Sequence, residues 1–147
     1  MRKNLRKTVA TIAMTVMLSV TAVVGIGFNA KAANTGDSPF SYNSANGSGT
    51  TDWRDKTDTT KVYVYPTSGP AIRYSVLGQN YGQAATTYQI CSNNVRIPLG
   101  VQGSITNHVY ESGYRRAKLR MTREKHQNLN TSGVWSPDST RNYTVFN

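Results

Sequence analysis

Residues 61–77 read KVYVYPTSGPAIRYSVL, and this stretch decides the fold class. Its first five residues carry β-branched or aromatic side chains on both faces, which is typical of a strand that is covered on two sides. A turn rich in Pro and Gly follows. The next run alternates, placing Ile72, Tyr74 and Val76 on one face of a strand. Two β runs joined by a turn indicate an all-β protein.

The same pattern continues beyond this stretch. Further β-type runs lie at 84–91, 95–101, 105–110, 114–121, 134–135 and 143–146. No sustained helical period is found after the N-terminal stretch. Roughly seven or eight short strands, spaced by about 8–12 residues, predict a small antiparallel β-sandwich or barrel over residues 60–147.

Residues 33–59 have a different composition. Asn, Thr, Gly and Ser dominate this stretch, and large apolar side chains are few. Such a segment buries little apolar surface, so we expect it to be flexible. Trp53 is the exception, and we expect it to dock where the folded domain begins.

The N-terminus has the three parts of an export signal. Residues 1–7 carry four cations, residues 8–28 are uncharged, and Ala30-Lys31-Ala32 supplies small residues at a cleavage site. This order predicts a helical signal peptide over 1–32, cleaved between Ala32 and Ala33, and a secreted, extracellular protein with no transmembrane segment after cleavage. The alternative is a leader retained as an anchor, because 21 uncharged residues are enough to span a bilayer.

Composition limits the possible classes of protein. The 147 residues carry a net charge of +10, and the part after the predicted leader keeps 12 basic and 7 acidic residues. One cysteine excludes a scaffold of internal disulfides. The length after the leader fits one domain, which excludes a multidomain enzyme.

Three stretches together resemble a known family. They are WRDKTDTTKVYVYPTSG at 53–69, ITNHVYESGY at 105–114 followed by AKLRM, and SGVWSPDS at 132–139. With the leader, they are similar to small exported proteins of Gram-positive bacteria that are catalogued as a domain of unknown function. The resemblance implies a secreted, all-β, non-enzymatic protein and brings no catalytic residues. A looser likeness, in size and aromatic content, is to secreted β-sandwich bacteriocins.

The strongest local signal is a basic segment. Its members are Arg115, Arg116, Lys118, Arg120, Arg123 and Lys125. On a strand, alternate residues project to one face about 7 Å apart, so this array favours an anionic partner. For an exported protein the partner would be an anionic envelope polymer or a lipid surface, and nucleic acid is not expected. The alternative is a solvated face that discourages edge pairing.

The tyrosines and tryptophans have two interpretations. Tyr63, Tyr65, Tyr74, Tyr81, Tyr88, Tyr110, Tyr114 and Tyr143 are spread over the predicted strands and their ends. Such rings most often cover a small β core, but exposed ones can stack on sugars or lie at lipid headgroups. Trp135 is expected in the core by the same reasoning.

Catalytic and metal-binding patterns are weak. Cys91, His108 and His126 form the single nucleophile-and-base set, and no flanking motif supports it. Asp52, Asp55 and Asp58 recur every third residue, which does not match a calcium loop. We therefore expect no enzyme activity, cofactor or metal. The favoured hypothesis is a secreted surface-interaction protein, and the alternative is a bacteriocin-like antimicrobial.

Overall fold

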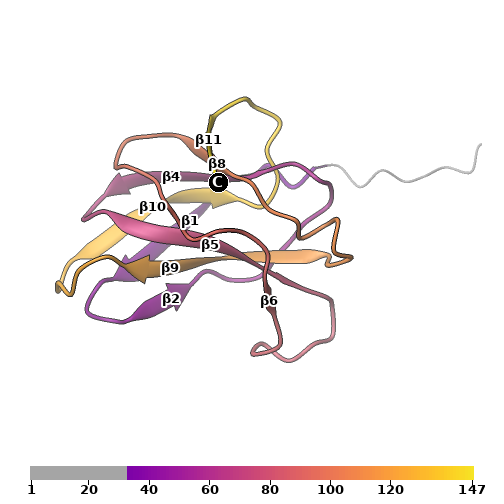
Figure 1. Cartoon of the computed structure of the whole chain (residues 1–147), viewed down its shortest axis with the longest axis horizontal. Coiled ribbons are helices and arrows are strands. Elements are labelled where there is room, and N and C mark those ends of the chain that lie inside the picture. The colour runs from indigo at the N-terminus through magenta and orange to yellow at the C-terminus, as the bar shows by residue number, and fades with distance from the viewer. Residues whose placement is uncertain (1–32) are drawn as a thin grey trace, which may run out of the picture.

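A computed structural model of the chain describes residues 33–147, and these contain eleven strands and no helix (Figure 1). The strands are β1 (Ser38–Asn43), β2 (Ser48–Thr50), β3 (Arg54–Asp55), β4 (Val62–Ser68), β5 (Ile72–Gln79), β6 (Gln89–Ile90), β7 (Val95–Arg96), β8 (Gly103–Ile105), β9 (Arg116–Arg123), β10 (Asn130–Ser136) and β11 (Thr144–Phe146). The predicted signal peptide, residues 1–32, lies outside the described residues. Within the described part of the chain, no helix is long and apolar enough to cross a membrane.

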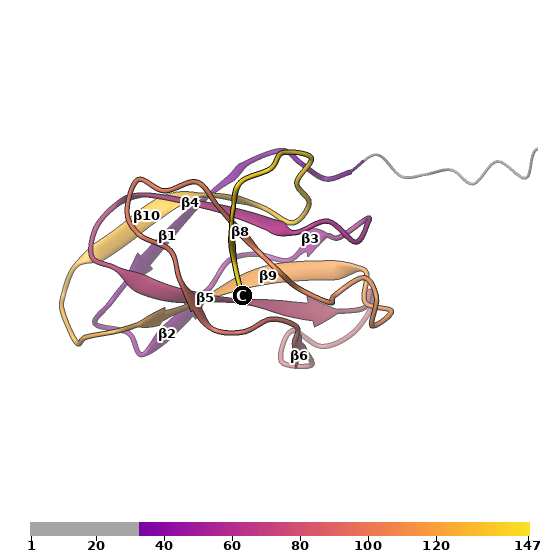
Figure 2. The same ribbon diagram turned by 45° about the horizontal axis from the view of Figure 1, so that its top comes forward.

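The strands form two sheets, which lie as two layers (Figure 2). The first sheet has the order β1-β10-β4-β8-β11, and the second has the order β2-β9-β5-β6, with β3 also paired to β9 and β7 to β5. All strand pairs are antiparallel except β11 with β8. The all-β prediction is confirmed, and since neither sheet closes into a barrel, the open two-sheet alternative holds. Residues 60–147 contain eight strands, β4 to β11, as predicted, and the three additional strands lie before residue 60.

One apolar core lies between the two sheets. Trp135 from β10 and Tyr74 from β5 are each 1% exposed, and both belong to the same buried cluster. Phe40 of β1 meets Tyr74 edge-on across the interface, with ring centroids 5.9 Å apart. This edge-to-face geometry is a favoured one for aromatic pairs. The contact links an edge strand of the first sheet to the centre of the second.

Residues 61–77 form β4 and most of β5. These two strands are consecutive in the chain but lie in different sheets. β4 is central in the first sheet, and its Val62 and Val64 are fully buried. β5 is central in the second sheet, and its three predicted inner side chains are 0–1% exposed. The strand β4 extends to Ser68, into the predicted turn at 66–70, and its Pro66 pairs with Gly133 at a register shift in β10. A bulge of this kind tolerates a proline, which has no N–H to donate.

The structure differs from the expectation of a flexible segment over 33–59, since this stretch contains β1, β2 and β3. The reason is that two aromatic residues, Phe40 and Tyr42, alternate toward the core and are 5% and 3% exposed. Gly49 in β2 makes room for this packing, because a Cβ there would lie 2.7 Å from the Tyr42 ring. Two large rings thus outweigh the polar composition around them.

The predicted strand at 84–91 is also reduced, to the two residues of β6. Gln79, at the end of β5, explains this difference. Its buried side-chain amide donates to the carbonyl oxygens of Gln83, Ala84 and Thr87, at 3.3, 2.5 and 2.9 Å. These bonds curl residues 80–88 into a loop, so the expected alternation toward a core does not form.

A buried ion pair ties the sheets together at one end. Lys56 and Asp138 side chains are both 0% exposed, and Nζ lies 2.6 Å from Oδ1. Lys56 also donates to the carbonyl oxygen of Thr60. The other carboxylate oxygen, Oδ2, accepts from the backbone N–H of Asn34 and from the N–H and hydroxyl of Thr57. Two of the stretches that carry the family resemblance, 53–69 and 132–139, therefore meet at this pair.

Candidate functional site

The candidate site is the outer face of the second sheet, which is built around β9. Ala117, Leu119 and Met121 of this strand are 0–1% exposed in the core. Since successive side chains of a strand point to opposite faces, Arg116, Lys118 and Arg120 are carried on the outer face. The alternation predicted from sequence for this strand is therefore the one the structure has.

The six predicted cations lie along the strand and do not converge on one point. Arg115 and Arg116 lie at the start of β9, whereas Arg123 ends it and Lys125 follows. The two ends are about 23 Å apart at the usual rise per residue. Arg123 donates to the carbonyl oxygen of Ala45 and contacts the ring of His126. The basic segment is thus an elongated stripe.

Aromatic rings accompany the cations at the start of β9. The Lys118 Nζ lies 4.5 Å from the centroid of the Trp53 ring and 5.3 Å from that of Tyr88. The Arg116 guanidinium carbon lies 5.8 Å from the Trp53 and Tyr81 centroids. These are cation–π distances, and they hold the long basic side chains in place on the surface.

A further cation–aromatic pair lies just before β9. The Arg115 guanidinium carbon is 4.1 Å from the Tyr110 ring centroid. Its Nη1 donates to the carbonyl oxygens of Tyr110 and Tyr114. Arg115 itself is exposed, so its charge faces solvent while its geometry is fixed.

Lys118 behaves differently from its neighbours. It is 8% exposed, and burial lowers the pKa of its ammonium group. The covering rings come from positions far away in sequence, Trp53 before β3 and Tyr88 before β6. Lys118 therefore holds the Trp53 and Tyr88 rings together on this face. Arg116 and the rings are more accessible from solvent than Lys118 is.

Two cations on this face were not among the predicted site residues. Arg73 of β5 and Arg96 of β7 are opposite each other in register, and Arg73 is also opposite Thr122 of β9. Both contact the carboxylate of Glu124, at 3.4 and 3.0 Å. The alternation around Arg73 was visible in the sequence, but its pairing with β7 and β9 was not.

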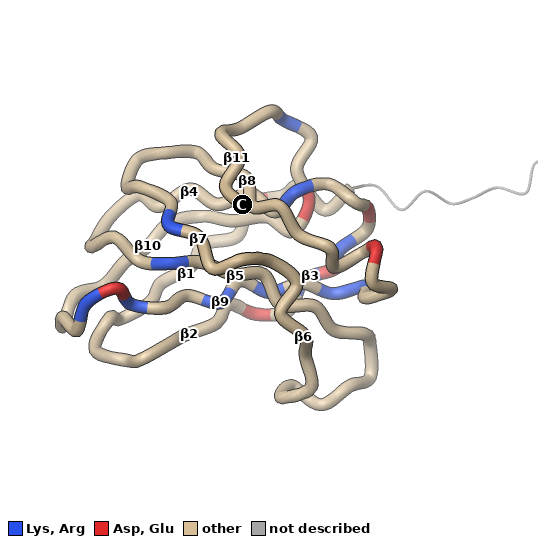
Figure 3. Tube along the Cα trace, viewed as in Figure 1, with Lys and Arg blue, Asp and Glu red and all other residues tan. Residues whose placement is uncertain are grey.

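The cations of the basic segment lack ion pairs in residues 33–147, although Asp55 of β3 is opposite Arg116 in register and Glu124 lies between Arg123 and Lys125 in the chain. Between residues 33 and 147, the cations that form ion pairs are Lys56, Arg73 and Arg96. None of the six predicted site residues takes part in one. Basic positions recur along β9 and beside β5 and β7 in Figure 3. The outer face of the second sheet therefore presents a positive surface.

The loop between β5 and β6 adds apolar side chains to this face. Figure 2 shows it projecting from the second sheet on the side away from the first. Tyr81, Tyr88 and Ile90 are 55%, 38% and 54% exposed. They are half of the large exposed apolar side chains in residues 33–147. Sequence reasoning placed Tyr88 and Ile90 on a regular strand and missed this cluster.

The weak nucleophile-and-base set comes together in part, since Cys91 and His108 line one pocket whereas His126 does not. The Cys91 side chain is fully buried, and burial raises the pKa of its thiol. The backbone N–H of His108 donates to the carbonyl oxygen of Cys91, while the His108 residue is exposed. His126 lies at the far end of β9, in contact with Arg123. The Cys91 thiol donates to the carbonyl oxygen of Gln89 at 3.6 Å.

Of the three aspartates at 52, 55 and 58, Asp58 has a local structural role. Asp58 accepts from the backbone N–H of Thr60 at 2.8 Å, which is the Asx-turn chemistry expected for an aspartate among threonines. Residues 33–147 hold no group of three or more His, Cys, Asp or Glu side chains that could bind a metal ion.

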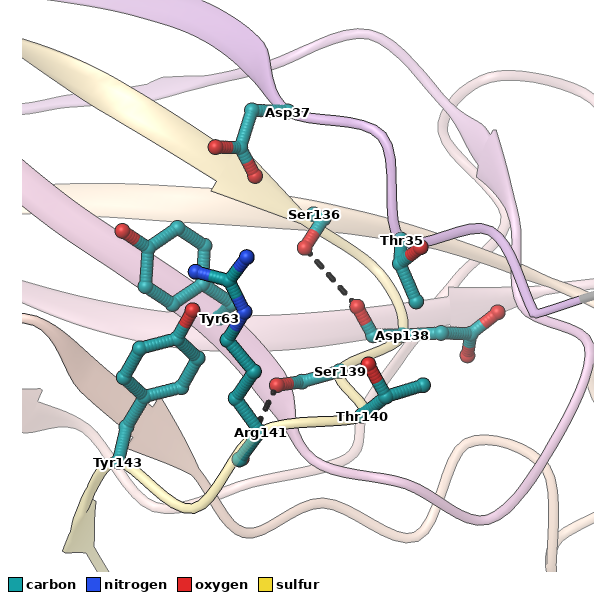
Figure 4. Close-up of a pocket in the computed structure, with 9 residues that line it drawn as sticks. All are labelled: Thr35, Asp37, Tyr63, Ser136, Asp138, Ser139, Thr140, Arg141 and Tyr143. Atoms are coloured by element: carbon teal, nitrogen blue, oxygen red, sulfur yellow. Dashed lines mark hydrogen bonds between the residues drawn. The ribbon is translucent and has the colours of Figure 1, made fainter.

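A small polar pocket of about 160 Å³ opens next to the buried ion pair (Figure 4). The rings of Tyr63 and Tyr143 lie side by side, with centroids 4.5 Å apart, and the Arg141 side chain is next to them. Burial, with Tyr143 and Asp37 nearby, raises the pKa of Tyr63 to about 12. The Tyr63 hydroxyl therefore stays protonated near neutral pH. The Asp138 carboxylate points away from the two rings in this view.

Comparison with known proteins identifies a family. The family model described as "Protein of unknown function (DUF2712)" matches residues 28–139, about three quarters of the chain. The chain belongs to this family. The match covers β1 to β10 and ends before β11. It confirms the resemblance to a domain of unknown function, whereas the Gram-positive origin and the bacteriocin likeness stay predictions. No curated protein and no solved structure matches the chain.

Proposed function

We propose that this DUF2712 protein is an exported, non-enzymatic protein that binds anionic cell-envelope material through the outer face of its second sheet. The observation that carries the proposal is the array of cations in the basic segment. Its six cations form no ion pair in residues 33–147, and aromatic rings hold three of them: Arg115, Arg116 and Lys118. A fixed array of unpaired cations attracts phosphate or carboxylate groups with little ordering cost.

The export part of the proposal rests on the leader. Cleavage between Ala32 and Ala33 would release residues 33–147, which include both sheets. N-terminal sequencing of protein from the culture medium should read Ala-Asn-Thr-Gly-Asp. Recovery of the protein in membranes alone, with Met1 retained, would show that the leader is an anchor.

Binding should be electrostatic in origin. Screening shortens from about 30 Å at 0.01 M salt to about 8 Å at 0.15 M salt. Affinity for teichoic acid or for vesicles with anionic lipids should therefore fall steeply over this range. An affinity that does not change with salt would argue against the positive face as the binding surface.

A charge-matched pair of variants tests the location of the site. Each cation near an anionic lipid surface is worth about 1 kcal/mol, so Arg116→Ser with Arg120→Ser should weaken binding roughly thirtyfold. Lys118 is left unchanged because its burial under two rings would confuse the result.

The control is Lys61→Ser with Arg141→Ser, which removes two exposed cations that lie away from β9. Lys56 is unsuitable as a control because it forms the buried ion pair. If both double variants lose the same affinity, net charge alone governs binding and the proposed site is wrong.

The second candidate function is a bacteriocin-like antimicrobial. The exposed apolar side chains of Tyr81, Tyr88 and Ile90 beside the cations favour it, because membrane-active proteins combine these two properties. Adding the purified protein to sensitive bacteria and scoring killing together with pull-down by isolated walls separates this function from simple adhesion.

A further inference from the structure

We propose that the anionic partner is a lipid bilayer surface, and that Tyr81, Tyr88 and Ile90 form its apolar contact. We call these three side chains, together with Arg116, the docking surface. The inference rests on the proposed function, since it uses the same positive face. It adds a partner and a second set of contacts that the basic segment alone does not require.

The strand register places apolar and basic side chains in one row across the sheet. Ile90 of β6 is opposite Leu77 of β5, and Leu77 is opposite Lys118 of β9. Directly opposed residues point to the same face. Leu77 is fully buried on this face, whereas Ile90 at the edge is 54% exposed. The row therefore ends in an apolar side chain that the protein leaves about half exposed.

The tyrosines join this row to the cations. The Tyr88 ring is 5.3 Å from Lys118 Nζ, and the Tyr81 ring is 5.8 Å from the Arg116 guanidinium carbon. Tyrosine combines an apolar ring with a polar hydroxyl, which suits the headgroup level of a membrane. Arginine beside it can meet lipid phosphates while its stem stays among the rings.

The loop is held in shape although its side chains are exposed. Gln79 is 1% exposed, and its amide donates to three carbonyl oxygens of residues 83–87. Asn80 N–H donates to Oε1 of Gln83. A loop held by these hydrogen bonds can present apolar side chains with little further ordering on contact, which lowers the entropic cost of docking.

A bilayer explains both halves of the docking surface, whereas a soluble polyanion explains one. Phosphate polymers would gain from Arg116 and its neighbours, but they offer nothing apolar to Ile90. A bilayer offers anionic headgroups to the cations and an apolar interior to a side chain that projects beyond them. Charge complementarity and the adjacent apolar cluster therefore favour the bilayer.

The test uses the purified protein with vesicles of phosphatidylcholine, with and without phosphatidylglycerol, and with soluble poly(glycerol phosphate) as a separate ligand. The test variant is Tyr81→Ser with Ile90→Ser. The control is Leu99→Ser with Leu129→Ser, whose leucines are 52% and 54% exposed on other loops. Thermal unfolding of all three proteins confirms that each is folded.

We expect the test variant to bind phosphatidylglycerol vesicles about tenfold more weakly than the parent, because it loses partly buried apolar area on docking. The control variant should bind vesicles as the parent does, and all three proteins should bind poly(glycerol phosphate) equally. Equal vesicle binding by both variants would overturn the bilayer inference.

The remaining outcomes separate the two proposals. Binding of the parent protein to poly(glycerol phosphate) but not to vesicles would overturn the bilayer inference and leave the proposed function standing. Binding to neither ligand at low salt would overturn both. Ile90→Trp combined with Trp53→Phe adds a direct readout, because docking as proposed shifts the emission of the new tryptophan to the blue in vesicles and not with the soluble polymer, while Trp135 stays buried in the core.

Discussion

Asp138, the acidic partner in the buried ion pair, accepts hydrogen bonds from Lys56, Thr57 and Asn34. Burial alone would raise the pKa of Asp138, but hydrogen bonds from Lys56, Thr57 and the Asn34 N–H, with the charge of Lys56, hold this pKa below its ordinary value. A carboxylate whose pKa is lowered by folding stabilises the folded state above its unfolded pKa of about 4. That stabilisation is lost as the pH falls through this value toward the folded pKa.

The first prediction follows from this sign. The stability of the parent protein to urea should fall between about pH 5 and pH 3, and Asp138→Asn should flatten this pH dependence. At neutral pH the variant should also lose about 3–5 kcal/mol of unfolding free energy, because it leaves Lys56 buried without its partner. Urea titrations across this pH range measure both effects. A variant with the parent's stability and pH slope would contradict the role given to the pair.

The second prediction concerns Leu119. This side chain is 0% exposed in the core between the sheets. Leu119→Ala should lower the free energy of unfolding by about 2–5 kcal/mol, through lost burial and the cavity left behind. Urea unfolding gives the value. A cost below about 0.5 kcal/mol, the usual range for surface changes, would contradict its burial.

Single residues also show where sequence reasoning ends. Alternation assigned Leu119 to the core and Lys118 to the other face, because a strand has a period of two. The burial of Lys118 was not predictable. It depends on Trp53 and Tyr88, which come from loops 65 and 30 positions earlier in the chain.

At the scale of elements, the strands with strong alternation were predictable and those with a few large rings in polar sequence were not. β5 and β9 follow their patterns. β1 was missed because two aromatic residues suffice to bury it, while its composition is typical of a linker. Residues 84–88 of this loop were assigned to a strand because the capture of carbonyl groups by Gln79 leaves no trace in the pattern.

The third prediction concerns this loop. Gln79→Ala removes three hydrogen bonds to residues 83–87, each worth about 1 kcal/mol, so amide exchange in 80–88 should quicken about tenfold or more. Hydrogen exchange with mass spectrometry measures it. Gln102→Ala, at an exposed position, is the control. Unchanged exchange in the loop would show that Gln79 does not hold it.

For the whole molecule, the shared core implies one cooperative unit. Trp135 of the first sheet and Tyr74 of the second lie in the same buried cluster, so neither sheet keeps a core if the other opens. The sequence predicted the all-β class from strand spacing. It did not predict which strands pair, because neighbours such as β1 and β10 are about 90 residues apart and share no pattern.

The fourth prediction tests this cooperativity. Trp53→Phe leaves Trp135 as the single tryptophan, and it reports on the first sheet. Its fluorescence and the far-UV circular dichroism of both sheets should change at the same urea concentration, as two-state unfolding requires. A fluorescence transition that precedes the loss of circular dichroism would show that the sheets unfold separately.

The hydrogen bonds around Asn34 have a consequence for timing. Its backbone N–H and carbonyl oxygen bond to Asp138, its side-chain amide donates to the Asp55 carbonyl oxygen, and its side-chain oxygen accepts from Arg54. This residue is two positions after the proposed cleavage at Ala32. A peptidase needs an extended, accessible substrate, and the folded protein holds this segment against its own surface. If the leader is cleaved as proposed, its removal would have to precede closure of the fold, and processing and folding would then compete for one short stretch of chain.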